Sequence, residues 1–226
     1  MPFFPPFSVP SKVEMTSLVQ WDVVKATKGL VYLAPGIPDD ARQLLTQPGH
    51  TMGRLIGLGA FASVYHVTDH PEYVVKEALR DQVDPDLFSK ACGFTALRMN
   101  VALSHGLAKL PNTTLSSGKN LVTPKYYGAS DDGNTFRVVM SFEQGTPIYA
   151  GNPAAGTHDE RRLILDAAMI AGGAEPPADG KYDDEPSAGY TNLVDQPDPN
   201  GPGRVVLLDA SSIVKGNLED DILWLL

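Results

Sequence analysis

The residues best suited to chemistry are two closely spaced glycines, Gly57 and Gly59, and a lysine that follows them, Lys76. The glycines lie between two apolar, β-prone runs, so we expect a glycine turn between two strands. A backbone without side chains can approach a ligand closely and turn N–H groups toward an anion. Lys76 ends a third β-prone run, where it shares one strand face with Val74. The pattern predicts either a phosphate-binding loop with a cation aimed at it, or an ordinary glycine hairpin with a solvated lysine.

A dinucleotide-binding turn uses similar glycines, but there they lead from a strand into a helix. Here the residues after Gly59 are β-branched and aromatic, which indicates a hairpin. The pattern G-x-G-x-x-[GA]-x-V followed by V-x-K resembles the glycine-rich loop of the protein kinase fold and the lysine on the second strand after that loop. Ala62 replaces the third glycine, and Val74 stands at the usual alanine position. The resemblance implies that the loop covers the phosphates of ATP and that Lys76 contacts the α- and β-phosphates.

A second pair of polar residues, Asn192 and Asp209, flanks an expected hairpin near the end of the sequence. Asn192 precedes one short apolar strand and Asp209 ends the next, with a turn rich in Pro and Gly between them. Separately, they would be a turn asparagine and a strand-end aspartate. Their order resembles that of the kinase family, in which an Asn and the Asp of the DFG position hold Mg²⁺. The resemblance implies that Asn192 and Asp209 are metal ligands, and that Lys76 and Asp209 are the catalytic residues.

Between these two groups of residues we expect two more strands and a hinge. Residues 121–128 are predicted to form one strand and 135–142 the next, with a turn at 130–134. This hairpin resembles the last two strands of a kinase N-lobe, with residues 141–143 as the hinge that holds an adenine edge. Met140 stands at the gatekeeper position, although core packing explains it equally well. The residues implied to contact ATP are Ile56, Gly57, Gly59, Val64, Val74, Lys76, Met140, Phe142 and Val194.

Two departures from the family pattern bear on catalysis. The helix expected at 87–110 contains no Asp or Glu. In the kinase family, the lysine that corresponds to Lys76 pairs with a glutamate of that helix. The family's catalytic aspartate lies five residues before the metal-binding Asn, and Ser187 stands at that position. Acidic residues at 183–185 could supply a carboxylate if the loop is rearranged. An active protein Ser/Thr kinase and a nucleotide-binding pseudokinase therefore both stay open, with a small-molecule kinase as a third possibility.

The expected fold is α+β, with two kinase-like lobes. Residues 1–49 are predicted to form a proline-rich arm and a short helix at 41–45, with strand and helix both open at 21–33. Residues 50–145 form an N-lobe, with a five-stranded antiparallel sheet and one helix, and the hinge. Residues 146–226 form a reduced helical C-lobe with a small hairpin. This reduced form resembles the minimal kinases that bacterial pathogens deliver as effectors, and also degenerate kinase-like proteins.

The C-lobe helix expected at 159–170 has a clear start signal. Thr157 is a candidate N-cap, and Glu160, three residues on, completes a capping box. We expect its apolar residues to form the stripe that packs on the core. The members of that predicted stripe are Leu163, Ile164, Ala167 and Ala168.

Composition narrows the class of partners. The formal net charge of −9 argues against non-specific binding to nucleic acid or to an anionic membrane. The single cysteine, Cys92, cannot form an internal disulfide, which fits a reducing compartment, and buried packing or a reactive thiol would explain it. The sequence lacks an apolar run of the ~18 residues needed for a membrane span and lacks a classical signal peptide. We expect a monomer that uses ATP and Mg²⁺ on a protein substrate, in the cytoplasm or after delivery into a host cell.

Overall fold

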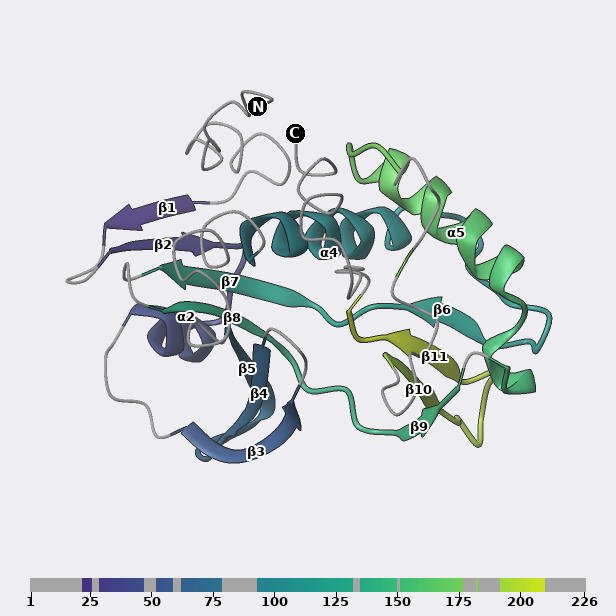
Figure 1. Ribbon diagram of the computed structural model, residues 1–226, viewed down its shortest axis with the longest axis horizontal. Helices are drawn as coiled ribbons and strands as arrows, with labels where there is room; N and C mark the ends of the chain where they lie inside the picture. The colour runs from purple at the N-terminus through teal and green to yellow at the C-terminus, as the bar shows by residue number, and fades with distance from the viewer. Residues whose placement is uncertain are drawn as a thin grey trace, which may run out of the picture.

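The protein has a mixed α+β architecture built on two sheets, as the computed structural model in Figure 1 shows. Several predicted features lie outside the described residues, among them the N-terminal arm, Gly59, Cys92, the acidic residues at 183–185 and Ser187. None of the helices in the described part has the length and hydropathy needed to span a membrane. The described residues are 22–25, 29–46, 52–58, 62–78, 93–131, 135–149, 151–176, 182 and 192–209.

The larger sheet is antiparallel and has seven strands, not the five expected. The two additional strands, at residues 22–25 and 30–33, pair antiparallel with each other, and residues 30–33 also pair with β7, with Leu33 opposite Gly128. The second of these strands, Leu-Val-Tyr-Leu at 30–33, supplies three buried side chains, so joining the sheet removes apolar surface from water. The strand order is β1 (Asp22–Lys25), β2 (Leu30–Leu33), β7 (Tyr126–Asp131), β8 (Phe136–Ser141), β5 (His70–Ala78), β4 (Ala62–Val67) and β3 (Met52–Leu58).

Two helices cover opposite faces of this sheet. Helix α2 (Asp39–Thr46), the predicted short helix, buries Ala41 and Leu45 in a cluster with Tyr73 and Val75 of β5. Helix α4 (Gly93–Leu107) contributes Val101 to a cluster that contains Val74, between those two residues in the strand. Alternate residues of β5 therefore face α2 and α4, as the two-residue period of a strand requires.

The smaller sheet has the order β6 (Asn120–Val122), β11 (Arg204–Leu207), β10 (Leu193–Gln196) and β9 (Thr146–Ile148). It shares a core with α4 and with helix α5 (His158–Ala171), which lies against α4 in Figure 1. Helix α4 thus packs on both sheets and connects the two halves of the molecule.

The single strand expected at 121–128 is divided between the sheets. Its first part is β6, which pairs in parallel with β11, and its second part is β7 of the larger sheet. Pro124 lies in the connection, where it needs no ladder hydrogen bond because it has no N–H to donate. The prediction of one continuous strand was wrong because a local pattern cannot show a change of pairing partner.

Helix α5 confirms the predicted cap and corrects the predicted stripe. Thr157 and Glu160 form a reciprocal capping box. Ala168 is buried and Ile164 packs on the core as predicted, but Leu163 is 70% exposed and Ala167 is exposed. The other buried positions are Arg161, Leu165 and Met169. A charged residue therefore occupies the inner face, where its Nη1 donates to the carbonyl oxygens of Ala155 and Gly156 at 2.9 and 3.0 Å.

Candidate functional site

Lys76 and Asp209 meet between the two sheets. Lys76 lies near the end of β5, opposite Val64 of β4 and Val138 of β8, so it shares the α4 face of the sheet with Val74. Asp209 follows β11 of the smaller sheet. Lys76 Nζ donates to Asp209 Oδ2, and the two side chains are only 25% and 20% exposed. The structure thus brings together the two residues that the sequence analysis assigned to catalysis.

Helix α4 adds a third residue, Asn100, which the sequence analysis missed. Asn100 is 3% exposed, and its Nδ2 donates to Asp209 Oδ1 at 2.8 Å. Each carboxylate oxygen of Asp209 therefore accepts a hydrogen bond from a different element. The sequence does contain a signal for this residue. Asn100 interrupts an apolar run, and a buried amide must have a hydrogen-bond partner.

Asn192 lies at the same end of the β10–β11 hairpin as Asp209. Its carbonyl oxygen accepts a hydrogen bond from the backbone N–H of Leu208 at 2.7 Å, which continues the ladder past Leu193 and Leu207. Asp209 is the next residue after Leu208. The backbone therefore places both predicted metal ligands at the same end of the two central strands of the smaller sheet.

Four of the residues predicted to hold adenine belong to one apolar cluster on the α4 face. Val74 and Met140 are buried cross-strand partners, and Val64 and Phe142 pack against the same cluster. Val194 is also buried, but it belongs to β10 of the smaller sheet. A Cβ built on Gly145 would lie 2.4 Å from Cγ1 of Val194, so the chain leaving the hinge passes directly over this side chain.

The glycine-rich end of the predicted site is only partly described. Gly57 lies in β3 opposite Val64, and a Cβ there would meet Val64 Cβ at an ordinary 3.5 Å. Ile56, on the same strand, is exposed. Gly59 lies outside the described residues.

Residues 141–143, the predicted hinge, form hydrogen bonds with both β5 and β10. The N–H of Phe142 donates to the carbonyl oxygen of Glu72 at 2.8 Å. Ser141 Oγ donates to Glu143 Oε1 at 2.7 Å, and Gln196 Nε2 donates to Glu143 Oε2 at 3.0 Å. Glu143 thereby connects the hinge to β10, which fixes the position of the smaller sheet at this point.

Tyr126 is a buried side chain close enough to Asp209 to be affected by its charge. Its side chain belongs to the cluster on the α4 face, and its hydroxyl lies 3.5 Å from the carbonyl oxygen of Leu208. Burial raises the pKa of the Tyr126 phenol well above its ordinary value, and the negative charge of Asp209 raises it further. Tyr126 is therefore neutral at physiological pH and adds no charge to the site.

The sequence matches no protein-family model, and it matches no curated protein. Solved structures do match, among them one described as "PpkA-294 apo form", with 16% identity and a TM-score of 0.42. The match covers 77% of this chain and 63% of that one, so the chain spans less than two thirds of the structure it resembles. At this level of likeness, a functional conclusion has to come from the site itself.

Proposed function

We propose that the chain is a kinase-like domain that binds ATP and transfers its γ-phosphate to a Ser or Thr of a protein. The contact between Lys76 and Asp209 carries the proposal. These residues come from separate sheets, and their convergence is what a site for a polyphosphate and its counterion needs. In this proposal the larger sheet with α2 and α4 is the N-lobe, and the smaller sheet with α5 is the C-lobe.

The donor types at the site fit the proposed ligands. A carboxylate and an amide oxygen, from Asp209 and Asn192, are oxygen ligands of the kind that Mg²⁺ prefers. When bound, Mg²⁺ would neutralise charge on the phosphates. Lys76 would bind the α- and β-phosphates, while Val64, Val74, Met140 and Val194 would enclose the base. The ammonium group of Lys76, which pairs with Asp209, would move to the phosphates when ATP binds.

One observation favours a second function, that of a nucleotide-binding pseudokinase. Lys76 and Asn100 each occupy one oxygen of Asp209, so a metal ion would have to compete with two existing partners. The sequence of α4 also contains no acid that could draw Lys76 away. Phosphoryl transfer relies mainly on positioning and charge neutralisation, so these features weaken the case for an enzyme without removing it.

The test separates nucleotide binding from catalysis. Thermal unfolding with ATP, with and without Mg²⁺, measures binding, and transfer of labelled γ-phosphate to a protein mixture measures activity. We expect ATP to raise the Tm, and Lys76→Ala to abolish the rise. Lys109→Ala is the matched control, because Lys109 is exposed and donates to a backbone carbonyl of α5.

Three results decide between the readings. Phosphate transfer that is lost in Asp209→Ala, with the fold intact, supports the enzyme. A Tm rise without transfer supports the pseudokinase. No Tm rise under either condition contradicts both.

A further inference from the structure

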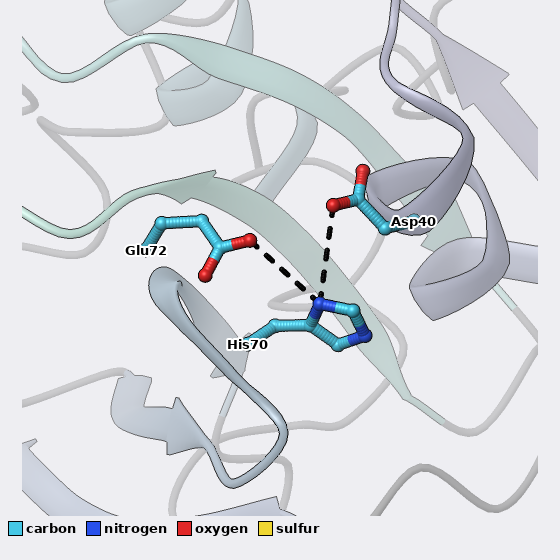
Figure 2. Close-up of side chains that lie close together, drawn as sticks. All are labelled: Asp40, His70 and Glu72. Atoms are coloured by element: carbon cyan, nitrogen blue, oxygen red, sulfur yellow. Dashed lines mark ion pairs between the residues drawn. The ribbon is translucent and has the colours of Figure 1, made fainter.

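A cluster of metal-ligating side chains lies away from the Lys76–Asp209 pair, at the start of β5. Figure 2 shows Asp40, His70 and Glu72 pointing toward one another. His70 Nδ1 lies 3.9 Å from Asp40 Oδ2 and 3.7 Å from Glu72 Oε1. One ligand atom from each of the three residues lies within 4.8 Å of the other two.

Two separate elements bring these side chains together. Asp40 belongs to the first turn of α2, whereas His70 and Glu72 are two residues apart at the start of β5. The pairing of β4 with β5 shifts register at this point, between His66 and Val67. A register shift changes the direction of nearby side chains. His70 and Glu72 can therefore face Asp40 of α2, although strict alternation with Val74 would place them on the α4 face.

The carboxylate of Asp40 is held with one oxygen directed at the cluster. The backbone N–H of Ala41 and the hydroxyl of Tyr73 both donate to Oδ1, at 2.8 and 3.0 Å. Oδ2 is the oxygen that faces His70. Hydrogen bonds of this kind orient metal ligands in many proteins.

We propose that Asp40, His70 and Glu72 bind one divalent transition-metal ion of the zinc class. One imidazole nitrogen and two carboxylate oxygens form a donor set that Zn²⁺ accepts, whereas Mg²⁺ and Ca²⁺ prefer oxygen ligands alone. Tetrahedral bonds of about 2.1 Å place ligand atoms about 3.4 Å apart. The pairs at 3.7 and 3.9 Å would reach that spacing by small rotations of partly exposed side chains, and the third pair, between the two carboxylates, lies within 4.8 Å.

The ion would cross-link helix α2 to the β4–β5 hairpin. Helix α2 covers one face of the larger sheet and precedes β3 in the chain, so the link would join segments that are distant in sequence. Because the ligands converge only in the folded chain, binding would stabilise the folded state by mass action. This site is independent of the proposed function, since its residues do not include Lys76, Asn192 or Asp209.

The test uses the full chain, freed of metal and then dialysed against Zn²⁺ alone, without nucleotide. Bound zinc is measured by elemental analysis, and Co²⁺ in place of Zn²⁺ reports the ligand set through its d–d absorption. We expect one ion per chain and a rise in Tm. The variants His70→Gln and Glu72→Gln should each weaken binding at least tenfold.

Two controls make the result specific. His158→Gln removes an imidazole that also lies 3.7 Å from a carboxylate, that of Asp159, but belongs to no group of three possible metal ligands among the described residues. Asp209→Asn removes the carboxylate of the proposed nucleotide site. Both should still bind one Zn²⁺. Glu72 is half exposed, so Glu72→Gln keeps the test decisive even if His70→Gln does not fold.

The proposal is overturned if the unmodified chain binds no Zn²⁺, or if His70→Gln and Glu72→Gln bind it as tightly as the unmodified chain. It is also overturned if Asp209→Asn loses the ion, because the zinc would then lie at the nucleotide site. Failure of ATP to bind would contradict the proposed function and leave this result unaffected.

Discussion

Lys76 and Asp209 are 133 positions apart in the sequence and form an ion pair that joins the larger sheet to the smaller one. Asn100 donates to the other oxygen of the same carboxylate, so β5, α4 and the segment after β11 all meet at Asp209. A carboxylate that follows β11 and has partners on β5 and α4 ties the two halves of the molecule together at this point. The same contact is the point at which the proposed nucleotide would have to act.

The Lys76–Asp209 pair should contribute measurably to stability. In urea unfolding of Lys76→Met, Asp209→Asn and the double variant, we expect a coupling free energy of about 1 kcal/mol, because the groups are partly screened by solvent. Arg162 and Asp166 are the control, a pair one helical turn apart on α5, with side chains 45% and 29% exposed and 3.7 Å between Nε and Oδ2. Their coupling should not exceed about 0.5 kcal/mol. Equal coupling in the two cycles would show that the contact between the sheets has no special role.

Replacing Asn100 should destabilise the protein more than its size suggests. Asn100→Ala removes a buried donor and leaves Asp209 Oδ1 without it, for an expected loss of about 1–3 kcal/mol. Asn100→Asp should cost at least as much, because it places a second carboxylate beside Asp209. Asn112→Ala is the control, since that exposed side chain accepts from a nearby backbone N–H. Chemical denaturation measures all three, and a loss for Asn100→Ala no larger than the control's would contradict the contact.

Helices α4 and α5 approach closely enough to require glycine. A Cβ built on Gly106 would lie 1.7 Å from the carbonyl oxygen of Ala168, and one on Gly172 would lie 2.1 Å from that of Ala102. Alanine normally stabilises a helix interior by about 1 kcal/mol relative to glycine. Here Gly106→Ala should instead destabilise by about 3 kcal/mol or more, because backbone cannot move aside as a side chain can.

The control for that substitution is Gly151→Ala, in a loop where no atom lies within 4 Å of the added Cβ. It should change the free energy of unfolding by less than about 0.5 kcal/mol. If Gly106→Ala were neutral or stabilising, the two helices would have to be farther apart than the structure has them.

Stability should fall in mild acid partly because of His105. Partial desolvation lowers the pKa of this imidazole although its side chain is exposed, and the positive charge of Lys109 lowers it further. The unfolded chain therefore binds a proton at His105 at a pH where the folded chain does not, and stability decreases as pH falls below about 6.5. His105→Gln should make this decrease shallower in urea unfolding between pH 5 and 8. Proton NMR should place the pKa of His105 below that of a free histidine, and Lys109→Met should raise it. A pKa at or above the ordinary value would contradict the prediction.

Local patterns were sufficient for the features whose cause lies within a few residues. Short-range geometry accounts for the capping box of α5 and for the start of α2 at paired aspartates. It also accounts for the opposite directions of Val74 and Val75 in β5. The β-prone runs around Gly57 likewise predicted a hairpin, and β3 pairs with β4 in the structure. Short-range rules suffice there because each feature depends on neighbours along the chain.

The buried face of α5 shows where local reasoning fails. A hydrophobic pattern assigns Leu163 to the core and Arg161 to solvent, but the structure reverses both. The reversal depends on the carbonyl oxygens of Ala155 and Gly156, which happen to face the helix and accept from the guanidinium group. No residue pattern within the helix reports where those oxygens lie.

By itself, then, the sequence determined most of the strands and helices around the site and pointed to Lys76, Asn192 and Asp209, while it left strand and helix open at 21–33. Tertiary structure alone decided that β1 and β2 extend the larger sheet, that residues 120–131 divide between two sheets, that Asn100 reaches Asp209 and that Asp40 meets His70 and Glu72. The physical reason is the same in each case. Contacts between distant segments depend on which surfaces are buried against each other. The residue pattern of one segment does not show which other segment will cover it.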